Sequence, residues 1–210
     1  MKRTSAVACS RLALAAALTI AITLAANTAI AEAPKATEKI DMAEMMARAK
    51  KLTQPSEHHQ LLKRFLGTWD TQLEFTMAGM DGPPEKGTAT FSWLMEGRWL
   101  EMKSSGTFLG SPNQSYMIFG YDNFKQSYVT VSVGNVDTAM LTSEGDLDPR
   151  GDVLITYGTL DEYLTGEHDK MVKYVWRFHG DDKIVLEVHD LPIGEHNAQV
   201  MELTFNRKRG

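Results

Sequence analysis

The spacing of apolar residues changes once along the chain, close to Gly67. In residues 40–52 and 56–66, apolar side chains recur every three to four positions, which is typical of helices with one apolar face. From Trp69 onward apolar and polar residues alternate, so that every second side chain falls on the same face. Alternation of this kind predicts β-strands. The pattern therefore predicts two short helices followed by a series of strands.

The first predicted helix carries a stripe of methionines. Met42, Met45 and Met46 recur at helical spacing, and we interpret the stripe as a packing surface, the usual role of methionine at such spacing. The alternative is a surface that docks on a partner or on a second copy of the chain.

The second predicted helix has a capping residue at each end. Ser56 is a suitable N-cap, and Gly67 can adopt the left-handed conformation of a C-cap. At 3.6 residues per turn, its apolar side is expected to hold His58, Leu61, Leu62, Phe65 and Leu66. His59 is expected on the more exposed side.

About ten strands follow, each bounded by Gly, Asp, Asn or Pro. They are expected near 68–76, 87–95, 98–105, 115–121, 126–133, 137–144, 153–159, 171–179, 183–189 and 198–207. Gly145 with Asp146 is expected to form a turn. The connections are too short for helical crossovers, so successive strands are antiparallel. Because an open sheet leaves unpaired edges, we expect an all-β fold, a closed up-and-down barrel, with a β-sandwich as the alternative.

One hairpin has a register that the alternation specifies. Pairing the apolar face of 171–179 with that of 183–189 places Phe178 opposite Ile184 and Trp176 opposite Leu186. The loop between them is then the three residues 180–182.

The beginning of the chain reads as a secretory signal peptide. Lys2, Arg3 and Arg11 precede a run of apolar residues without charge, and small residues follow up to Ala31. We predict cleavage after Ala31. The alternative is a retained anchor helix, since roughly 20 apolar residues can span a bilayer.

Removal of this segment sets the organisation and charge of the mature chain. The expected parts are a signal peptide 1–31, a leader with an amphipathic helix 32–55, and a barrel domain 56–210. The only cysteine, Cys9, is lost with the signal peptide, so the mature chain forms no disulfide. It keeps 19 of the 22 basic residues against 27 acidic ones, a net charge of −8, which repels nucleic acid. We expect an exported protein, periplasmic or extracellular, with no stable membrane insertion and no nucleic-acid partner.

The stretch around Gly67 and Trp69 resembles the opening of the lipocalins and fatty-acid-binding proteins. In those barrels, a tryptophan at the closed end is covered by an arginine from the last strand. The resemblance implies this role for Trp69 and Arg207, and Arg207 shares a strand face with Leu203 and Phe205. A guanidinium over an indole is a favourable cation–π arrangement.

Five sequence blocks extend a second resemblance over residues 57–208. "EHHQLLKRFLGTW", "GRWLEMKSSG", "FGYDNFKQSYV", "SEGDLD" and "MELTFNRK" are similar, in this order, to blocks of a bacterial family called domain of unknown function 1579. This resemblance implies a lipocalin-like barrel and no particular reaction. A barrel of this kind points to a small apolar or amphipathic ligand, whose identity stays open.

Candidate catalytic residues are few. The mature chain has no cysteine and no Gly-x-Ser-x-Gly motif, so no catalytic residue is assigned. Nitrobindin-like barrels also begin with "GTW" and bind heme through a histidine near the last strands; His189 or His196 would serve here. The glycine-rich continuation of that family is replaced by residues 70–73, so we expect no cofactor, with heme or metal as the alternative. A heme- or metal-dependent enzyme and a structural or protein-interaction module are the alternatives to ligand binding.

Overall fold

The alternation that begins at Trp69 corresponds to ten antiparallel strands that close into one barrel. The structure is a computed structural model and describes residues 41–76, 82–162, 166–191 and 198–209. The strands follow one another around the barrel in chain order, and the first pairs with the last. The expected closed up-and-down barrel is confirmed, and the β-sandwich alternative is wrong.

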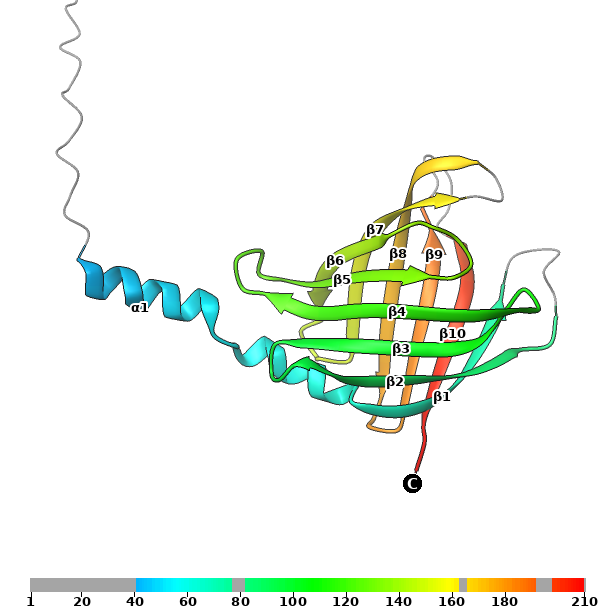
Figure 1. Ribbon diagram of the computed structural model, residues 1–210, viewed down its shortest axis with the longest axis horizontal. Coiled ribbons are helices and arrows are strands. Elements are labelled where there is room, and N and C mark those ends of the chain that lie inside the picture. Colours follow the sequence, from blue (N-terminus) through cyan, green and yellow to red (C-terminus); the bar gives the residue numbers. More distant parts are fainter. Residues whose placement is uncertain (1–40, 77–81, 163–165, 192–197, 210) are drawn as a thin grey trace, which may run out of the picture. The chain divides into compact units, whose positions relative to one another are not determined.

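The bounds of the elements are close to those expected. The helical elements are α1 (Met42–Thr53) and η1 (Glu57–Arg64), and the strands are β1 (Gly67–Phe75), β2 (Glu85–Met95), β3 (Trp99–Phe108), β4 (Ser111–Asp122), β5 (Ser127–Gly134), β6 (Leu141–Leu147), β7 (Val153–Glu162), β8 (Glu167–His179), β9 (Lys183–Asp190) and β10 (Ala198–Arg207). In Figure 1 strands β2 to β4 run across the direction of β8 to β10, as the twist of a closed sheet requires.

The sixth strand differs most from its expected position. It begins at Leu141 and contains Gly145, so the predicted turn at Gly145 and Asp146 is wrong. A Cβ atom at Gly145 would overlap the carbonyl oxygen of Ile155 in β7, so this glycine allows a close approach of two strands. The turn between β6 and β7 follows at Asp148. One carboxylate oxygen of Asp148 accepts hydrogen bonds from the backbone N–H groups of Asp152 and Val153, at 2.8 Å each.

The hairpin of β8 and β9 has the predicted register. Phe178 pairs with Ile184 and Trp176 with Leu186, and the loop is the three residues 180–182. Gly180 stands first in this loop with φ +67°, a conformation that glycine adopts without strain.

Helix α1 packs none of its side chains into the core. None of its residues is buried, and Met42 and Met46 are 64% and 62% exposed. The interpretation of the methionine stripe as a packing surface is therefore wrong for this structure. The C-terminal end of α1 is attached through its backbone, because Arg98 donates to the Thr53 carbonyl at 2.6 Å. Within the described ranges, no helix has the length and apolarity needed to cross a membrane.

The second helical element is a 3₁₀-helix, and this reverses the expected positions of its two histidines. With three residues per turn, His59, Leu62 and Phe65 share one face, and all three are buried. His58 is exposed and stacks on Tyr121, with ring centroids 4.4 Å apart. The expectation of an exposed His59 assumed an α-helical period and is wrong.

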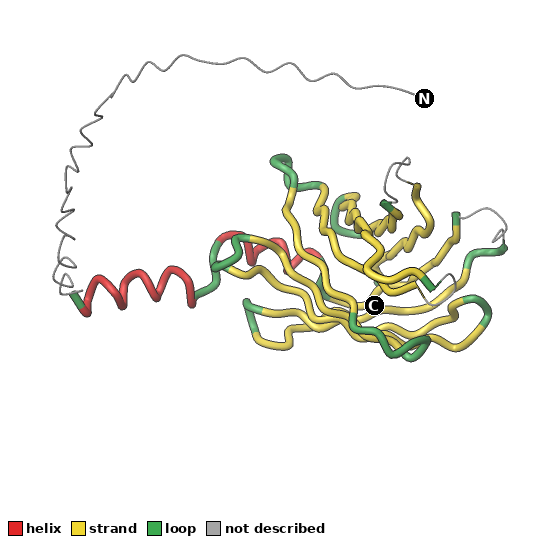
Figure 2. Tube along the Cα trace, turned by 90° about the horizontal axis from the view of Figure 1, so that it is seen from above, coloured by secondary structure: helices red, strands yellow, loops and turns green. Residues whose placement is uncertain are grey.

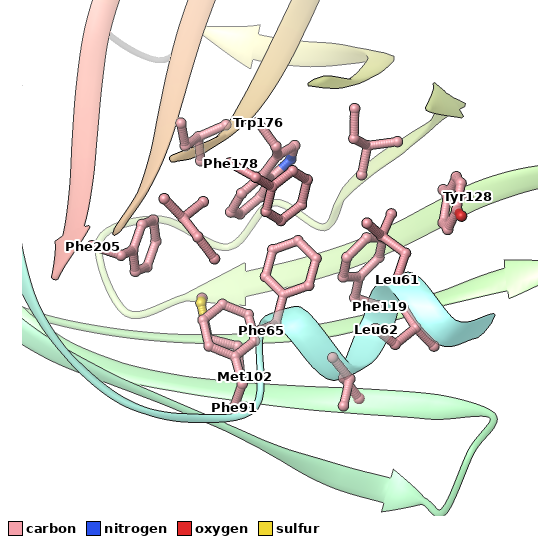
Figure 3. Packing of buried hydrophobic residues seen from close by; sticks show 14 of the residues in the cluster. Leu61, Leu62, Phe65, Phe91, Met102, Phe119, Tyr128, Trp176, Phe178 and Phe205 are labelled. Atoms are coloured by element: carbon pink, nitrogen blue, oxygen red, sulfur yellow. The ribbon is translucent and has the colours of Figure 1, made fainter. Parts of the chain in front are cut away.

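Phe65 fills one end of the barrel. Its ring lies at the end of η1 and makes edge contacts with Phe119, Trp176 and Phe178, at centroid distances of 4.9, 5.5 and 5.2 Å. Figure 3 shows these rings converging on Phe65 from several strands. In Figure 2 the η1 segment reaches the strands at this end. We call it the closed end of the barrel.

Two further hydrogen bonds hold η1 against the closed end. The Tyr128 hydroxyl donates to the His58 carbonyl at 2.9 Å, and Arg64 donates to the Gly151 carbonyl at 2.7 Å. Burial raises the pKa of Tyr128 to about 12, so its hydroxyl keeps its proton and stays a donor over the whole physiological range. The 3₁₀-helix is thus joined to β5 and to the loop before β7.

His59 makes the stability of the closed end depend on pH. Burial lowers the pKa of this imidazole, because desolvation disfavours its charged form, and its unprotonated Nδ1 accepts the Ser56 N–H at 3.0 Å. The unfolded chain therefore binds a proton that the folded chain excludes. The stabilising contribution of the neutral His59 side chain is complete above a pH of about 6.5. It is lost as the pH falls through the lower pKa of His59 in the folded chain.

We expect the free energy of unfolding in urea to fall more steeply below pH 6.5 in the wild type than in His59→Asn, whose amide oxygen can still accept the Ser56 N–H. His58→Asn, at the neighbouring exposed position, is the matched control and should follow the wild type. Parallel pH profiles for the wild type and His59→Asn would contradict this account.

Candidate functional site

Trp69 lies at the closed end, where the first strand begins. Its side chain is fully buried, and the indole N–H donates to the Phe65 carbonyl at 2.7 Å. Arg207 is its cross-strand partner in β10, and the guanidinium carbon stands 4.0 Å from the centre of the indole. The structure thus places together the tryptophan and the arginine named from the sequence.

The guanidinium of Arg207 also binds backbone carbonyl groups on two sides. It donates to Arg64 at 2.8 Å, to Leu66, and to Asp181 at 2.6 Å. One side chain therefore links β10, the end of η1 and the loop between β8 and β9. A lysine could not make these contacts, because only the planar guanidinium offers several donors in fixed directions.

Gly67 is required where the chain passes from η1 into β1. Its φ of +117° is unfavourable for other residues, and a Cβ atom there would lie 2.9 Å from Nη1 of Arg207. The expected left-handed glycine is present, but it is the first residue of β1 and follows a 3₁₀-helix. Gly67, Trp69 and Arg207 together form the closure of the barrel.

A cavity of about 250 Å³ occupies the opposite, open end. Its floor is apolar and consists of Met102, Trp176, Leu186, Leu203 and Phe205. Trp176 separates the cavity from the packed core, since its other neighbours include Phe65 at a centroid distance of 5.5 Å. The cavity is the space that the aromatic side chains of the closed end leave unfilled.

Small and polar residues form the upper walls of the cavity. Ser104 and Ser115 face each other across β3 and β4 with hydroxyl oxygens 2.6 Å apart, and Ser132 lines the cavity from β5, opposite Met117. Gly87 and Gly106 lie opposite each other on β2 and β3 and leave this wall without side chains. The walls can therefore form hydrogen bonds, while the floor offers mainly apolar contact.

Glu85 is an acidic side chain of this wall, and its two carboxylate oxygens have different surroundings. It begins β2 and lies on the same strand face as Ala89 and Phe91, both buried. One carboxylate oxygen, Oε1, accepts the Gly110 N–H at 2.9 Å. The other, Oε2, is buried and has no hydrogen-bond partner in the described part of the chain.

The residues that line the cavity were not predicted from the sequence. A signal was present for Glu85, because it shares its parity with a run of inward-facing residues at Gly87, Ala89 and Phe91. An acidic residue in such a series indicates a carboxylate that points into the barrel. The serines carry no comparable signal, since exposed strands contain similar residues.

His189 lies on the outside of the barrel. Its neighbours Val188 and Leu186 are buried on the other face of β9, and His189 is absent from the residues that line the cavity. Its Nε2 is 3.0 Å from a carboxylate oxygen of Glu187, whose other oxygen binds Arg177. Burial opposes ionisation of Glu187, but the hydrogen bonds from Arg177 and His189 outweigh it and hold its pKa below the usual value.

The second histidine considered for heme or metal, His196, falls outside the described residues. Within the described part of the chain, no three His, Cys, Asp or Glu side chains are grouped so that they could hold a metal ion. The structure therefore does not bring the two named histidines together in a described site.

Comparison with known proteins identifies the family. The sequence profile of a family described as protein of unknown function (DUF1579) matches residues 54–207. The chain belongs to this family. Its match covers η1 and all ten strands of the barrel. No curated protein matches the chain significantly.

A solved structure resembles this DUF1579 protein in fold. Rv2717c from M. tuberculosis has 13% sequence identity and a TM-score of 0.53, over 74% of this chain and all of the other. A redesigned β-barrel (15% identity, 71% and 96% coverage, TM-score 0.37) and a de novo fluorescence-activating β-barrel (11% identity, 70% and 96% coverage, TM-score 0.39) are more distant. At 13% identity, the likeness to Rv2717c is one of fold alone.

The contact between Trp69 and Arg207 predicts how substitutions at these two positions change the free energy of unfolding. Trp69→Ala should lower the free energy of unfolding by about 3–5 kcal/mol, as expected for truncating a buried aromatic side chain. Arg207→Ala should lower the free energy of unfolding by a smaller amount. The effects of the two substitutions should depart from additivity by on the order of 0.5–3 kcal/mol, because each side chain loses its partner when the other is removed.

A double-mutant cycle in urea measures this coupling. Arg209→Ala is the matched control, since Arg209 follows two residues later and its side chain is 82% exposed. Its effect should be small and additive with Trp69→Ala. Additive effects of Arg207→Ala and Trp69→Ala would show that the contact between the two side chains does not stabilise the closure of the barrel.

Proposed function

We propose that this protein is an exported binding protein that holds a small amphipathic molecule in the cavity at the open end of its barrel. The observation that carries the proposal is the cavity of about 250 Å³ with an apolar floor and polar walls. Ligand sites have this composition, in which apolar side chains supply most of the contact and a few polar groups fix the orientation. The volume suits a small ligand.

Export is part of this proposal and rests on the sequence of residues 1–31. A mature chain without cysteine needs no disulfide outside the cytoplasm, because the closed barrel and its aromatic core supply its stability. An exported barrel with an unfilled apolar cavity is suited to carrying or sequestering a molecule of low solubility in water.

Binding is tested with a small neutral fluorophore, 1-aminoanthracene, added to the purified mature protein. We expect saturable binding at one molecule per chain, with fluorescence enhanced in the apolar cavity. Ser132→Phe should weaken it by roughly ten-fold or more, equivalent to about 1.4 kcal/mol, because the new ring occupies the cavity.

Val131→Phe is the matched control, because it adds the same ring at the neighbouring position on the outer face of β5. It should leave the affinity for 1-aminoanthracene unchanged. Absence of saturable binding to the wild type, or equal loss in both variants, would overturn the proposal. Native mass spectrometry of protein purified from its own host is a test that needs no added probe, and a bound small molecule would support the proposal.

A role as an interaction module is the second candidate, favoured by the exposure of α1. A helix that buries no residue contributes little to the stability of the barrel, although Met45 and Met46 offer an adaptable apolar surface. The partner considered is a second copy of this chain.

Deletion of residues 32–52 should then lower the oligomeric mass in solution while the thermal unfolding midpoint of the barrel stays within a few degrees. Sedimentation of the mature and the shortened chain measures this. If both have the mass of a monomer, α1 does not mediate self-association.

A further inference from the structure

The two oxygens of the Glu85 carboxylate have different roles. Oε1 accepts the N–H of Gly110 at 2.9 Å and so holds the turn between β3 and β4. This contact explains why an acceptor stands at the start of β2. It does not explain a carboxylate, because one amide oxygen would make the same hydrogen bond.

The second oxygen is unusual for a folded protein. Oε2 is buried without a hydrogen-bond partner, the only such side-chain atom among the described residues. A buried acceptor without a donor costs about 1–3 kcal/mol, and more when it is charged. Unsatisfied groups of this kind call for an explanation, such as a catalytic or binding role.

The described residues that line the cavity with Glu85 offer no internal cation to neutralise it. Glu85 lines the cavity together with Asp137, whose Oδ1 is occupied by the Ala139 N–H at 2.9 Å. Lys86 is the basic residue among the described lining, but it follows Glu85 directly, faces the opposite side of β2 and is exposed. Glu85 therefore lines the cavity with a carboxylate whose buried Oε2 lacks both a donor and a counter-charge among the described residues.

We propose that the cavity selects amphipathic ligands with a cationic, hydrogen-bond-donating head group, of which a primary alkylammonium is the simplest. Oε2 has almost no accessible surface in this structure, so the Glu85 carboxylate turns toward the cavity to bind the ammonium, and the alkyl chain lies on the floor formed by Trp176 and Leu186. A charge-assisted hydrogen bond in a site shielded from water is stronger than one between neutral groups. This inference rests on the proposed binding function and adds the chemical class of the ligand.

The same geometry excludes the opposite head group. A fatty acid would bring its carboxylate toward Glu85 and Asp137, and like charges in a shielded site repel each other. A neutral alcohol could donate one hydrogen bond to Oε2 but would leave the charge uncompensated. The expected order of affinity near neutral pH is therefore octylammonium, then octanol, then octanoate.

Isothermal titration calorimetry of the mature protein with these three probes tests the inference. The wild type should bind octylammonium at least about ten-fold more tightly than octanol, a difference of about 1.4 kcal/mol. In Glu85→Gln, which keeps the acceptor for Gly110, this preference should vanish while the affinity for octanol changes by less than about three-fold. Glu74→Gln removes a charge from an exposed position on the outer face of β1 and should keep the preference.

The outcomes separate this inference from the function on which it rests. Octanol binding without a preference for octylammonium, or a preference that survives Glu85→Gln, overturns the inference and leaves the binding function in place. No binding of any of the three probes overturns both. If Glu85→Gln lowers the thermal unfolding midpoint as much as Glu85→Ala and keeps the preference, the carboxylate is only structural.

Discussion

The pairing of the first strand with the last is the constraint on which the rest of the structure depends. β1 and β10 come from opposite ends of the barrel domain, so their contact brings distant parts of the chain together and costs conformational entropy. Trp69 and Arg207 stabilise it at the point where the strand pair begins. Arg207 joins the same point to the 3₁₀-helix, whose Phe65 then fills the closed end.

Filling one end of the barrel determines what the other end can contain. Aromatic side chains are large, and those around Phe65 occupy the interior up to Trp176. Beyond Trp176 the inward-facing residues on β2 to β5 are smaller, among them Gly87, Ser104 and Ser132, and they leave a cavity. The stable core and the candidate site thus share one barrel interior, with Trp176 at their boundary.

Glu85 indicates that the open end is not optimised for stability alone. A buried acceptor without a partner weakens the folded state, and an apolar side chain at this position would avoid that cost. Its neighbours at the open end are hydroxyl groups and glycines, whereas the closed end is filled with aromatic rings. Residues that reduce stability are expected where a protein binds a ligand.

The sequence by itself determined the features that depend on local periodicity. Alternation in steps of two specifies which side chains share a strand face, so it predicted the strands, the pairing of Phe178 with Ile184, and the common face of Phe205 and Arg207. Short connections made the strands antiparallel, and the need to pair their edges led to closure. These predictions need no knowledge of distant contacts.

Tertiary structure decided the features that depend on what lies opposite a residue. The segment at His59 became a 3₁₀-helix because its buried face must fit the end of the barrel, and this exchanged the positions of the two histidines. Gly145 is in a strand, and not a turn, because it pairs with both β5 and β7, and β7 passes too close for a side chain. The cavity and the unpartnered oxygen of Glu85 arise only when ten strands enclose a common interior, since the volume left empty depends on side chains far apart in the sequence.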